Sequence, residues 1–265
     1  MIRVLVNGAD GRMGSQVVKA VVADNELELV GGVSISHIGE DLGEIAGIGA
    51  LGLAVRAGLG TAVDELKPDV VIDFTTPQAV YGNVKTCIAY GVDIVVGTTG
   101  LTEKQRKELG EEAKRGDTSL FIAPNFSIGA VLLMKVSADI AAYFPDVEIV
   151  ELHHNNKLDA PSGTAVMTAD KIAAARRKAG AAPAPDRTRE SLEGARGASV
   201  QAVPVHSVRL PGYVAHQEVL FGGYGEILTV RHDSLDRKSF MPGVILAVKK
   251  VSSRKGLTFG LENYL

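Results

Sequence analysis

The sequence is poor in residues that cross-link chains, bind metal ions or attract polyanions. It has one cysteine, Cys87, among 265 residues, which excludes an internal disulfide and argues against structural zinc. The formal net charge is −3, so no surplus of positive charge favours nucleic acid or an anionic membrane as a partner. Low cysteine content is typical of reducing compartments, and we expect a cytoplasmic location.

Long apolar runs and large aromatics are also scarce. Ile128 to Met134, among the longest apolar runs, is far shorter than the roughly 20 residues of a transmembrane helix, and the first residues show no signal-peptide pattern. Tryptophan is absent, whereas glycine occurs 30 times. Many glycines with few aromatics indicate the tight strand-to-helix turns of an α/β nucleotide-binding fold.

The opening of the chain has the pattern of a dinucleotide-binding unit. Ile2 to Val6 predicts a strand and valines at helical spacing from Val17 predict a helix, with Gly8, Gly11 and Gly14 between them. We expect Gly8 to permit the tight turn, Gly11 to allow the close approach of a pyrophosphate, and Gly14 to let the helix pack on the strand.

The second predicted strand, Leu27 to Val33, is followed by Ser34 and not by a carboxylate. An acidic residue there would bind the ribose hydroxyl of NADH and repel the extra phosphate of NADPH. Its absence predicts that NADPH is accepted at least as well as NADH. From Gly39 to Gly60 glycine recurs with little periodicity, which indicates a long flap over the cofactor and not an ordered element.

Three more buried strands are predicted at Asp69–Phe74, Val92–Val96 and Leu120–Ala123. Loops of small and polar residues follow all three strands, at Thr75 to Pro77, Gly97 to Gly100 and Pro124 to Ser127. Ligands of open parallel sheets bind at the carboxyl ends of the strands, so we expect these loops beside the nicotinamide.

The stretch from Glu151 to Ala165 carries the most chemistry. A predicted strand over Val147–Leu152 places His153 and His154 at its carboxyl end, with Lys157 just beyond. Adjacent strand residues point to opposite faces, so both imidazoles can serve one site only if the strand ends between them. Either an imidazole or the lysine could act as a general acid. Vicinal strand histidines are poor co-ligands, and we expect no metal site.

A helix start follows these cations. Pro161 and Ser162 precede an alanine-rich run, Thr164 to Ala175, which predicts a helix capped by Ser162. Free backbone amides at Ser162, Gly163 and Thr164 would bind an anion such as a carboxylate or phosphate.

The rest of the chain completes two domains. An apolar helix is predicted over Ile128–Phe144, buried between the two halves of the molecule, and Gly180 to Gly197 has the composition of a mobile surface loop. A last helix over Phe240–Val251 leads to Gly256–Leu265, which returns to the first domain. Three long strands lie between these segments in an antiparallel arrangement whose edges favour self-association: Val200–Leu210, Tyr213–Phe221 and Glu226–His232.

We therefore expect an α/β protein. Residues 1–126 and 240–265 would form a dinucleotide-binding domain with a Rossmann-like parallel sheet. Residues 127–239 would form a smaller α+β domain that binds substrate and mediates oligomerisation.

Five motifs together resemble the dihydrodipicolinate reductase family, also called 4-hydroxy-tetrahydrodipicolinate reductase, essentially from end to end: Gly8 to Gly14, Asp73 to Thr75, Gly97 to Gly100, Ala123 to Ser127 and Glu151 to Ala165. The resemblance implies a Rossmann domain, a mixed-sheet substrate domain and a homotetramer built through that sheet. It also implies NADH- or NADPH-dependent reduction of a small dicarboxylate to tetrahydrodipicolinate in the diaminopimelate route to lysine.

The resemblance implies a role for each site residue. His153 would donate or accept a proton, Lys157 would donate one, and His154 would contact the substrate. Gly163 and Thr164 would bind a substrate carboxylate, beside the amide of Ser162 that the helix start already places in the same anion site. NADPH or NADH would be held by residues of several loops: Gly8, Ala9, Asp10, Gly11, Arg12, Met13, Gly97, Thr98, Thr99, Ala123, Pro124, Asn125 and Phe126. Ser34 is a further cofactor-binding candidate by its place after the second strand, and there the chain departs from the many relatives that have an acidic residue.

Two alternatives stay open at this point. Another two-domain nicotinamide oxidoreductase could act on an aspartate-derived aldehyde, but chemistry through a thioester needs a nucleophilic cysteine, and Cys87 falls in a predicted helix. The chain could also be a non-catalytic nicotinamide-nucleotide sensor, although a sensor has no need for Lys157 beside two histidines and an anion site.

Overall fold

The computed structural model describes residues 1–144, 146–181 and 186–265. Within these ranges the chain forms two compact units, Met1–Phe126 with Phe240–Leu265 and Ser127–Ser239. None of the helices in the described ranges combines the length and apolar character that a bilayer crossing requires.

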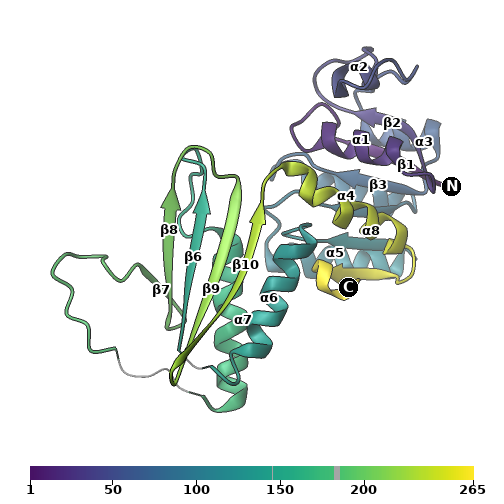
Figure 1. Ribbon diagram of the computed structural model, residues 1–265. Helices are drawn as coiled ribbons and strands as arrows, with labels where there is room; N and C mark the ends of the chain where they lie inside the picture. Colours follow the sequence, from purple (N-terminus) through teal and green to yellow (C-terminus); the bar gives the residue numbers. More distant parts are fainter. Residues whose placement is uncertain (145, 182–185) are drawn as a thin grey trace. The chain divides into compact units, whose positions relative to one another are not determined.

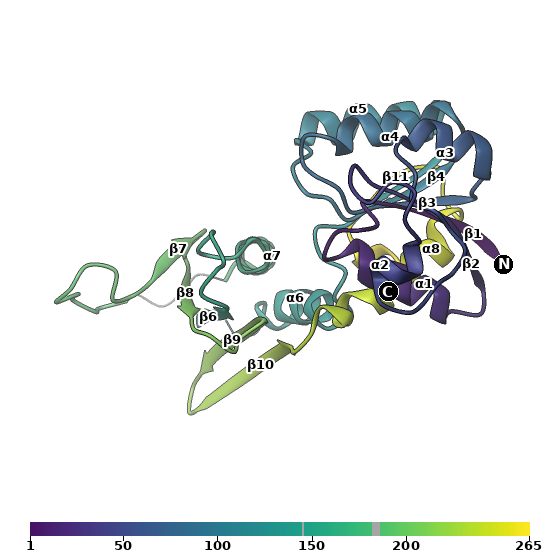
Figure 2. The same ribbon diagram turned by 90° about the horizontal axis from the view of Figure 1, so that it is seen from above.

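The first unit is built on a six-stranded parallel sheet with the order β11-β5-β4-β3-β1-β2 (Figure 1). Its strands are β1 (Ile2–Asn7), β2 (Leu27–Val33), β3 (Val70–Asp73), β4 (Asp93–Val96), β5 (Ser119–Ile122) and β11 (Gly256–Phe259). Its helices are α1 (Gly14–Ala23), α2 (Leu42–Ala46), α3 (Leu59–Leu66), α4 (Val80–Ala89), α5 (Glu103–Arg115) and α8 (Met241–Val251). Figure 2 shows α3, α4 and α5 on one face of the sheet and α1 with α8 on the other.

Helices on both faces explain why β3, β4 and β5 are buried at every residue. Their apolar side chains form one core with the helices, which includes Leu5, Val71, Ile94, Leu109 and Leu120. The predicted strands at the start of the chain are confirmed to within one or two residues. β11 pairs with β5, so the end of the chain returns to the first sheet as predicted.

The prediction of an irregular flap from Gly39 to Gly60 is wrong. The segment contains α2 and the start of α3, and its backbone is ordered around Asp41. The Asp41 carboxylate accepts hydrogen bonds from four backbone amides, at Gly43, Glu44, Leu51 and Gly52. These bonds lower the pKa of Asp41. One capping carboxylate therefore orders a glycine-rich segment whose sequence has no clear period.

The second unit is built on a five-stranded mixed sheet with the order β10-β9-β6-β8-β7. Its strands are β6 (Asp146–His153), β7 (Ala198–Val200), β8 (Val203–Arg209), β9 (Ala215–Gly223) and β10 (Glu226–Ser234). The predicted antiparallel pairing holds for β9 and β10. β8 and β9 do not pair, because β6 lies between them, parallel to β8 and antiparallel to β9. Alternation along a strand reveals its faces but not its neighbours.

Two helices cover one face of this sheet, α6 (Ile128–Ile140) and α7 (Gly163–Ala179), as Figure 2 shows. They bury the inward side chains of the strands, among them Val147, Ile149 and Phe221. α6 ends four residues before Phe144, where its predicted helix ends. α7 follows its prediction closely. In the predicted surface loop from Gly180 to Gly197, residues 182–185 lie outside the described part, and the described remainder contains neither helix nor strand.

Candidate active site

The site in the second unit is built around Glu151, which sits at an inward position of β6. Alternation along β6 directs Val147, Ile149 and Glu151 toward the helices, and the Glu151 side chain is fully buried. A buried carboxylate needs partners for its lone pairs. Glu151 therefore marks a position where the core of this unit becomes polar.

Four groups donate hydrogen bonds to Glu151. Arg209 of β8 binds it through both terminal nitrogens at 2.7 and 2.9 Å, His153 Nδ1 lies 2.5 Å away, and the Ser162 amide lies 3.1 Å away. Ser207 adds a side-chain hydrogen bond. Burial alone would raise the pKa of Glu151, but the hydrogen bonds from His153, Arg209 and Ser207 outweigh it and lower the pKa to about 2.

The two histidines occupy different positions relative to the end of β6. β6 ends at His153, whose side chain is only 12% exposed, and His154 is the first residue beyond the strand. The strand therefore ends between the two histidines, which is the arrangement that both imidazoles need in order to serve one site. His154 Nδ1 is buried and has no hydrogen-bond partner among the described residues.

Lys157 lies in the turn that follows. Its amide donates to the His154 carbonyl at 3.1 Å, and its ammonium group binds Asp159 Oδ1 at 2.7 Å. The bond from Lys157 lowers the pKa of Asp159. Arg209 also donates to the Asp159 carbonyl at 2.9 Å. Lys157, Asp159, Arg209, Glu151 and His153 thus form one connected network.

The helix start differs in part from the prediction. Ser162 is the N-cap of α7, and its hydroxyl accepts a hydrogen bond from the Ala165 amide at 3.2 Å, as predicted. The Ser162 amide is not free, however, because it donates to Glu151. The Gly163 amide hydrogen-bonds to Asp159. Acidic side chains of the chain itself therefore engage two of the amides that the sequence assigned to an anion.

The glycine turn of the first unit has the geometry that a dinucleotide fold requires. Gly8 has φ +80°, and a Cβ there would lie 2.4 Å from the Phe74 carbonyl oxygen. A Cβ on Gly14 would lie 1.9 Å from the Gly8 carbonyl oxygen. Only glycine fits either position, which confirms the expected tight turn and the close packing of α1 on it. The turn from Gly8 to Gly14 is therefore compatible with a bound nicotinamide dinucleotide.

Asp73, at the carboxyl end of β3, organises the neighbouring loops. Its fully buried carboxylate accepts hydrogen bonds from Asn7 at 2.9 Å, Thr98 at 2.6 Å, Asn83 at 2.8 Å and Thr75 at 2.9 Å. These donors come from β1, the loop after β4, α4 and the loop after β3. One side chain therefore fixes several loops at the edge of the sheet where ligands bind.

The remaining cofactor candidates lie at the same carboxyl ends. A Cβ on Gly97 would lie 2.1 Å from the Phe74 ring, so this loop packs tightly on the one after β3. Ala123 follows β5 and is buried, as is Phe126, whose ring packs against Phe74. The further predicted residues of these loops lie beside them in the chain: Thr99, Pro124 and Asn125.

Ser34 is buried at the tip of β2, where its hydroxyl accepts the Ser36 amide at 3.1 Å. The residues predicted after the first strand all lie in the turn between β1 and α1: Ala9, Asp10, Gly11, Arg12 and Met13.

Sequence reasoning missed Arg209 and the role of Glu151. The signal was present, because Glu151 and Arg209 continue the inward rows that begin with the apolar residues Val147 and Ile149 of β6 and Val203 and Val205 of β8. A charged residue in such a register is rare unless it is paired. The partner itself could not be identified, since the two residues are 58 positions apart and meet through the β6–β8 register.

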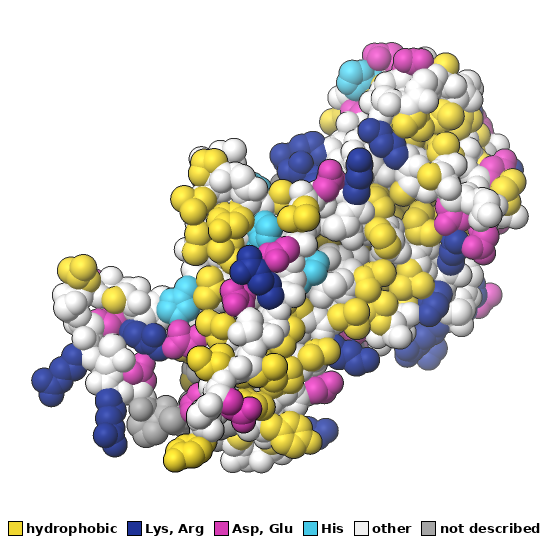
Figure 3. Space-filling view, viewed as in Figure 1, with side chains coloured by type: hydrophobic (Ala, Val, Ile, Leu, Met, Phe, Trp, Pro, Cys, Tyr) yellow, Lys and Arg dark blue, Asp and Glu magenta, His cyan; other side chains and the backbone are white. Residues whose placement is uncertain are grey.

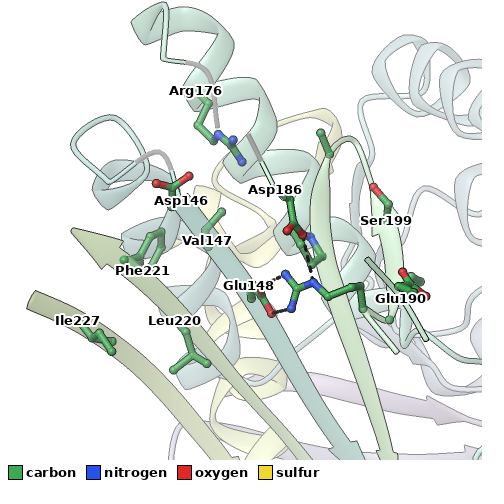
Figure 4. Close-up of a pocket in the computed structure, with 16 residues that line it drawn as sticks. Asp146, Val147, Glu148, Arg176, Asp186, Glu190, Ser199, Leu220, Phe221 and Ile227 are labelled. Atoms are coloured by element: carbon green, nitrogen blue, oxygen red, sulfur yellow. Dashed lines mark hydrogen bonds and ion pairs between the residues drawn. The ribbon is translucent and has the colours of Figure 1, made fainter. Parts of the chain in front are cut away.

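A separate cavity in the second unit is lined by apolar and small residues together with several charged side chains (Figure 4). Arg196 bridges Glu148 and Asp186 there. The acidic lining residues Asp146, Glu148, Asp186 and Glu190 outnumber the two arginines, Arg176 and Arg196. This balance disfavours a dicarboxylate, so the cavity is not the candidate active site.

Family models match both halves of the chain. Residues 2–126 match the N-terminal model of dihydrodipicolinate reductase, and residues 129–265 match the C-terminal model. A 4-hydroxy-tetrahydrodipicolinate reductase of Listeria monocytogenes is 50% identical over 266 residues, covering 100% of both chains. One from Syntrophomonas wolfei is 48% identical over 263 residues, covering 99% of this chain and 98% of the relative.

A solved structure agrees in fold as well as in sequence. The dipicolinate-bound dihydrodipicolinate reductase of a Paenisporosarcina species has a TM-score of 0.89 and 45% identity, covering 100% of both chains. Two family models, full-length relatives and this structural match all point the same way, and the chain belongs to the dihydrodipicolinate reductase family.

Proposed function

We propose that this chain catalyses the NAD(P)H-dependent reduction of 4-hydroxy-tetrahydrodipicolinate to tetrahydrodipicolinate, in the diaminopimelate route of lysine biosynthesis. Relatives of about half-identical sequence carry the name of this oxidoreductase. The observation that supports it best is the network that joins His153, Lys157 and the start of α7 in one site.

The substrate is a dicarboxylate, and this site offers cationic and hydrogen-bonding groups to it. Lys157, His153 and His154 would attract the carboxylates, and Ser162, Gly163 and Thr164 at the start of α7 would orient one of them. Asp159 pairs with Lys157 and the Gly163 amide in the structure. A substrate carboxylate that binds those groups would therefore replace Asp159.

The cofactor is NADPH or NADH, and it would be held in the first unit by the turn from Gly8 to Met13, by Ser34, by Gly97 to Thr99 and by Ala123 to Phe126. When bound, the reduced nicotinamide supplies the hydride. Asp73 would keep the loops around it in place through its bonds to Thr98 and Thr75.

The reaction also needs a proton, which the second unit would supply. The substrate loses its hydroxyl group as water, its conjugated ring accepts the hydride, and the neighbouring carbon accepts a proton. We assign that proton to Lys157 or His153, since both side chains can carry a transferable proton on nitrogen and both belong to the network around Glu151.

Self-association is part of the proposal. In the described part of the chain, the helices cover one face of the five-stranded sheet, and half-buried apolar residues line the other: Val150, Leu152, Val208 and Leu220. Figure 3 shows hydrophobic side chains gathered over these strands. We infer a homotetramer formed through this open face. A cytoplasmic location agrees with the chain's single cysteine.

The alternatives lack such support. Cys87 is fully buried in α4, and burial raises the pKa of its thiol, so it is a poor nucleophile for thioester chemistry. A sensor would not need a proton donor beside a carboxylate-binding helix start.

One assay separates these functions. Freshly generated 4-hydroxy-tetrahydrodipicolinate is mixed with the protein and NADPH or NADH, and the absorbance of the reduced nicotinamide is followed while the product is identified by mass spectrometry. The proposed function requires cofactor oxidation that matches tetrahydrodipicolinate formation. A sensor would bind the nucleotide without turnover, and an aldehyde dehydrogenase would turn over only with an aldehyde.

A further inference from the structure

The buried pair of Glu151 and Arg209 contacts three parts of the candidate active site. Glu151 binds the imidazole of His153 and the amide of Ser162, and Arg209 binds the carbonyl of Asp159. The Arg209 guanidinium makes two parallel bonds to the carboxylate, the geometry with the highest directional specificity for such a pair. The Arg209 side chain is 20% exposed, and the Glu151 side chain is fully buried.

The contact with His153 has a chemical consequence. An ionised carboxylate can only accept hydrogen bonds, so Nδ1 of His153 must carry the proton in the 2.5 Å contact. In a neutral ring the other nitrogen, Nε2, then has a free lone pair, and in a charged ring it carries the second proton. The same contact fixes the plane of the ring, as a carboxylate does for the histidine of a catalytic triad.

The contact with Ser162 involves the start of α7, which is the other part of the proposed site. The amide at the cap of α7 is tied to the same carboxylate that holds His153. The distance between the imidazole and the helix start is therefore set by one side chain. Arg209 extends this control to Asp159, which in turn binds Lys157.

We propose that Glu151 and Arg209 are positioning residues of the reductase: they hold His153 as the Nδ1–H tautomer, with Nε2 toward the substrate, and fix the start of α7 relative to it. This inference rests on the proposed function for the role of His153 but not for its tautomer. A stability role alone does not account for the pair, because apolar residues of similar volume usually stabilise such a position as well or better.

The first test needs no substitution. Nitrogen-15 NMR of protein labelled in its histidine rings reports which ring nitrogen is protonated, and H153N identifies the His153 signals. The Nδ1–H form is expected in the wild type at a pH where the ring is neutral. A free imidazole favours the Nε2–H form, so finding that form at His153 would overturn the inference.

The second test removes the pair while keeping the core filled. In E151L/R209M no acceptor faces Nδ1, and no charge is left unpaired. We expect a folded protein in which His153 changes to the Nε2–H form and kcat falls by about 10- to 100-fold, with a smaller change in KM. R209K, which keeps the cation, should retain the Nδ1–H form and lose less activity. Wild-type kcat in folded E151L/R209M would overturn the inference.

Glu148 provides a matched control. It lies on the same strand, points to the opposite face and also pairs with an arginine and a histidine, Arg196 and His206. E148Q should change the signals of His206 and leave His153 and kcat unchanged. The two proposals can be refuted separately. Full turnover in H153N would refute the catalytic role proposed for His153. Loss of turnover in H153N together with full turnover in E151L/R209M would refute only the positioning role of Glu151 and Arg209.

Discussion

Glu151 links the hydrogen-bond network of the candidate site to the stability of the fold. Its pKa is lowered to about 2, so the carboxylate is charged in the folded protein at pH values where it is protonated in the unfolded chain. The resulting stabilisation is fully present above about pH 4.5 and is lost as the pH falls toward 2; it amounts to about 3 kcal/mol.

We therefore expect the difference in unfolding free energy between the wild type and E151Q to shrink as the pH is lowered from 5 to 2, measured by urea denaturation. E111Q, which changes an exposed glutamate of α5, should show a small difference that is nearly constant over this range. If the difference in unfolding free energy between the wild type and E151Q stays constant with pH, the fold does not hold Glu151 in its charged form.

At the tip of β2, we expect Ser34 to influence the choice between NADPH and NADH. Its side chain is short and uncharged, and it is occupied by a bond to the Ser36 amide. The wild type should thus use NADPH at least as efficiently as NADH. S34E places a carboxylate at the tip of β2 and should shift the ratio of kcat/KM values toward NADH by about tenfold or more, equivalent to about 1.4 kcal/mol. An unchanged ratio would place the discriminating contact elsewhere.

At the scale of elements, the start of α7 stabilises the helix and belongs to the proposed site. Ser162 caps α7, and Thr102 caps α5 through a reciprocal capping box with Gln105. S162A and T102A should each lower the unfolding free energy by about 1 kcal/mol. Only S162A should also raise KM for the substrate, because only that helix start belongs to the proposed site. Equal kinetic effects in both variants would indicate a purely structural role for Ser162.

Local signals predicted much of this architecture. The strand end at His153, the cap at Ser162 and the turn at Gly8 depend on residues close together in the sequence, and all three are confirmed. The engagement of the Ser162 amide by Glu151 was not predictable, because it depends on a contact between different elements. The ordered segment around Asp41 was missed because one carboxylate, and not a periodic pattern, organises it.

At the scale of the whole molecule, the open face of the five-stranded sheet should hold the assembly together. Light scattering coupled to size-exclusion chromatography should give the mass of four chains. L220E places a charge among the apolar residues of that face and should yield smaller species, whereas V22E, on the partly exposed surface of α1, should not. A wild-type protein that elutes as a monomer would refute the tetramer.

The most direct measurement of the central claim is the steady-state rate of NADPH oxidation with freshly generated 4-hydroxy-tetrahydrodipicolinate, compared between the wild type, K157A and K178A. Lys178 lies in the last turn of the same helix that begins at the site and serves as a matched lysine control. We expect turnover in the wild type and in K178A, and a kcat lower by about 10² or more in K157A. Near-normal turnover in K157A, or none in the wild type, would contradict the account.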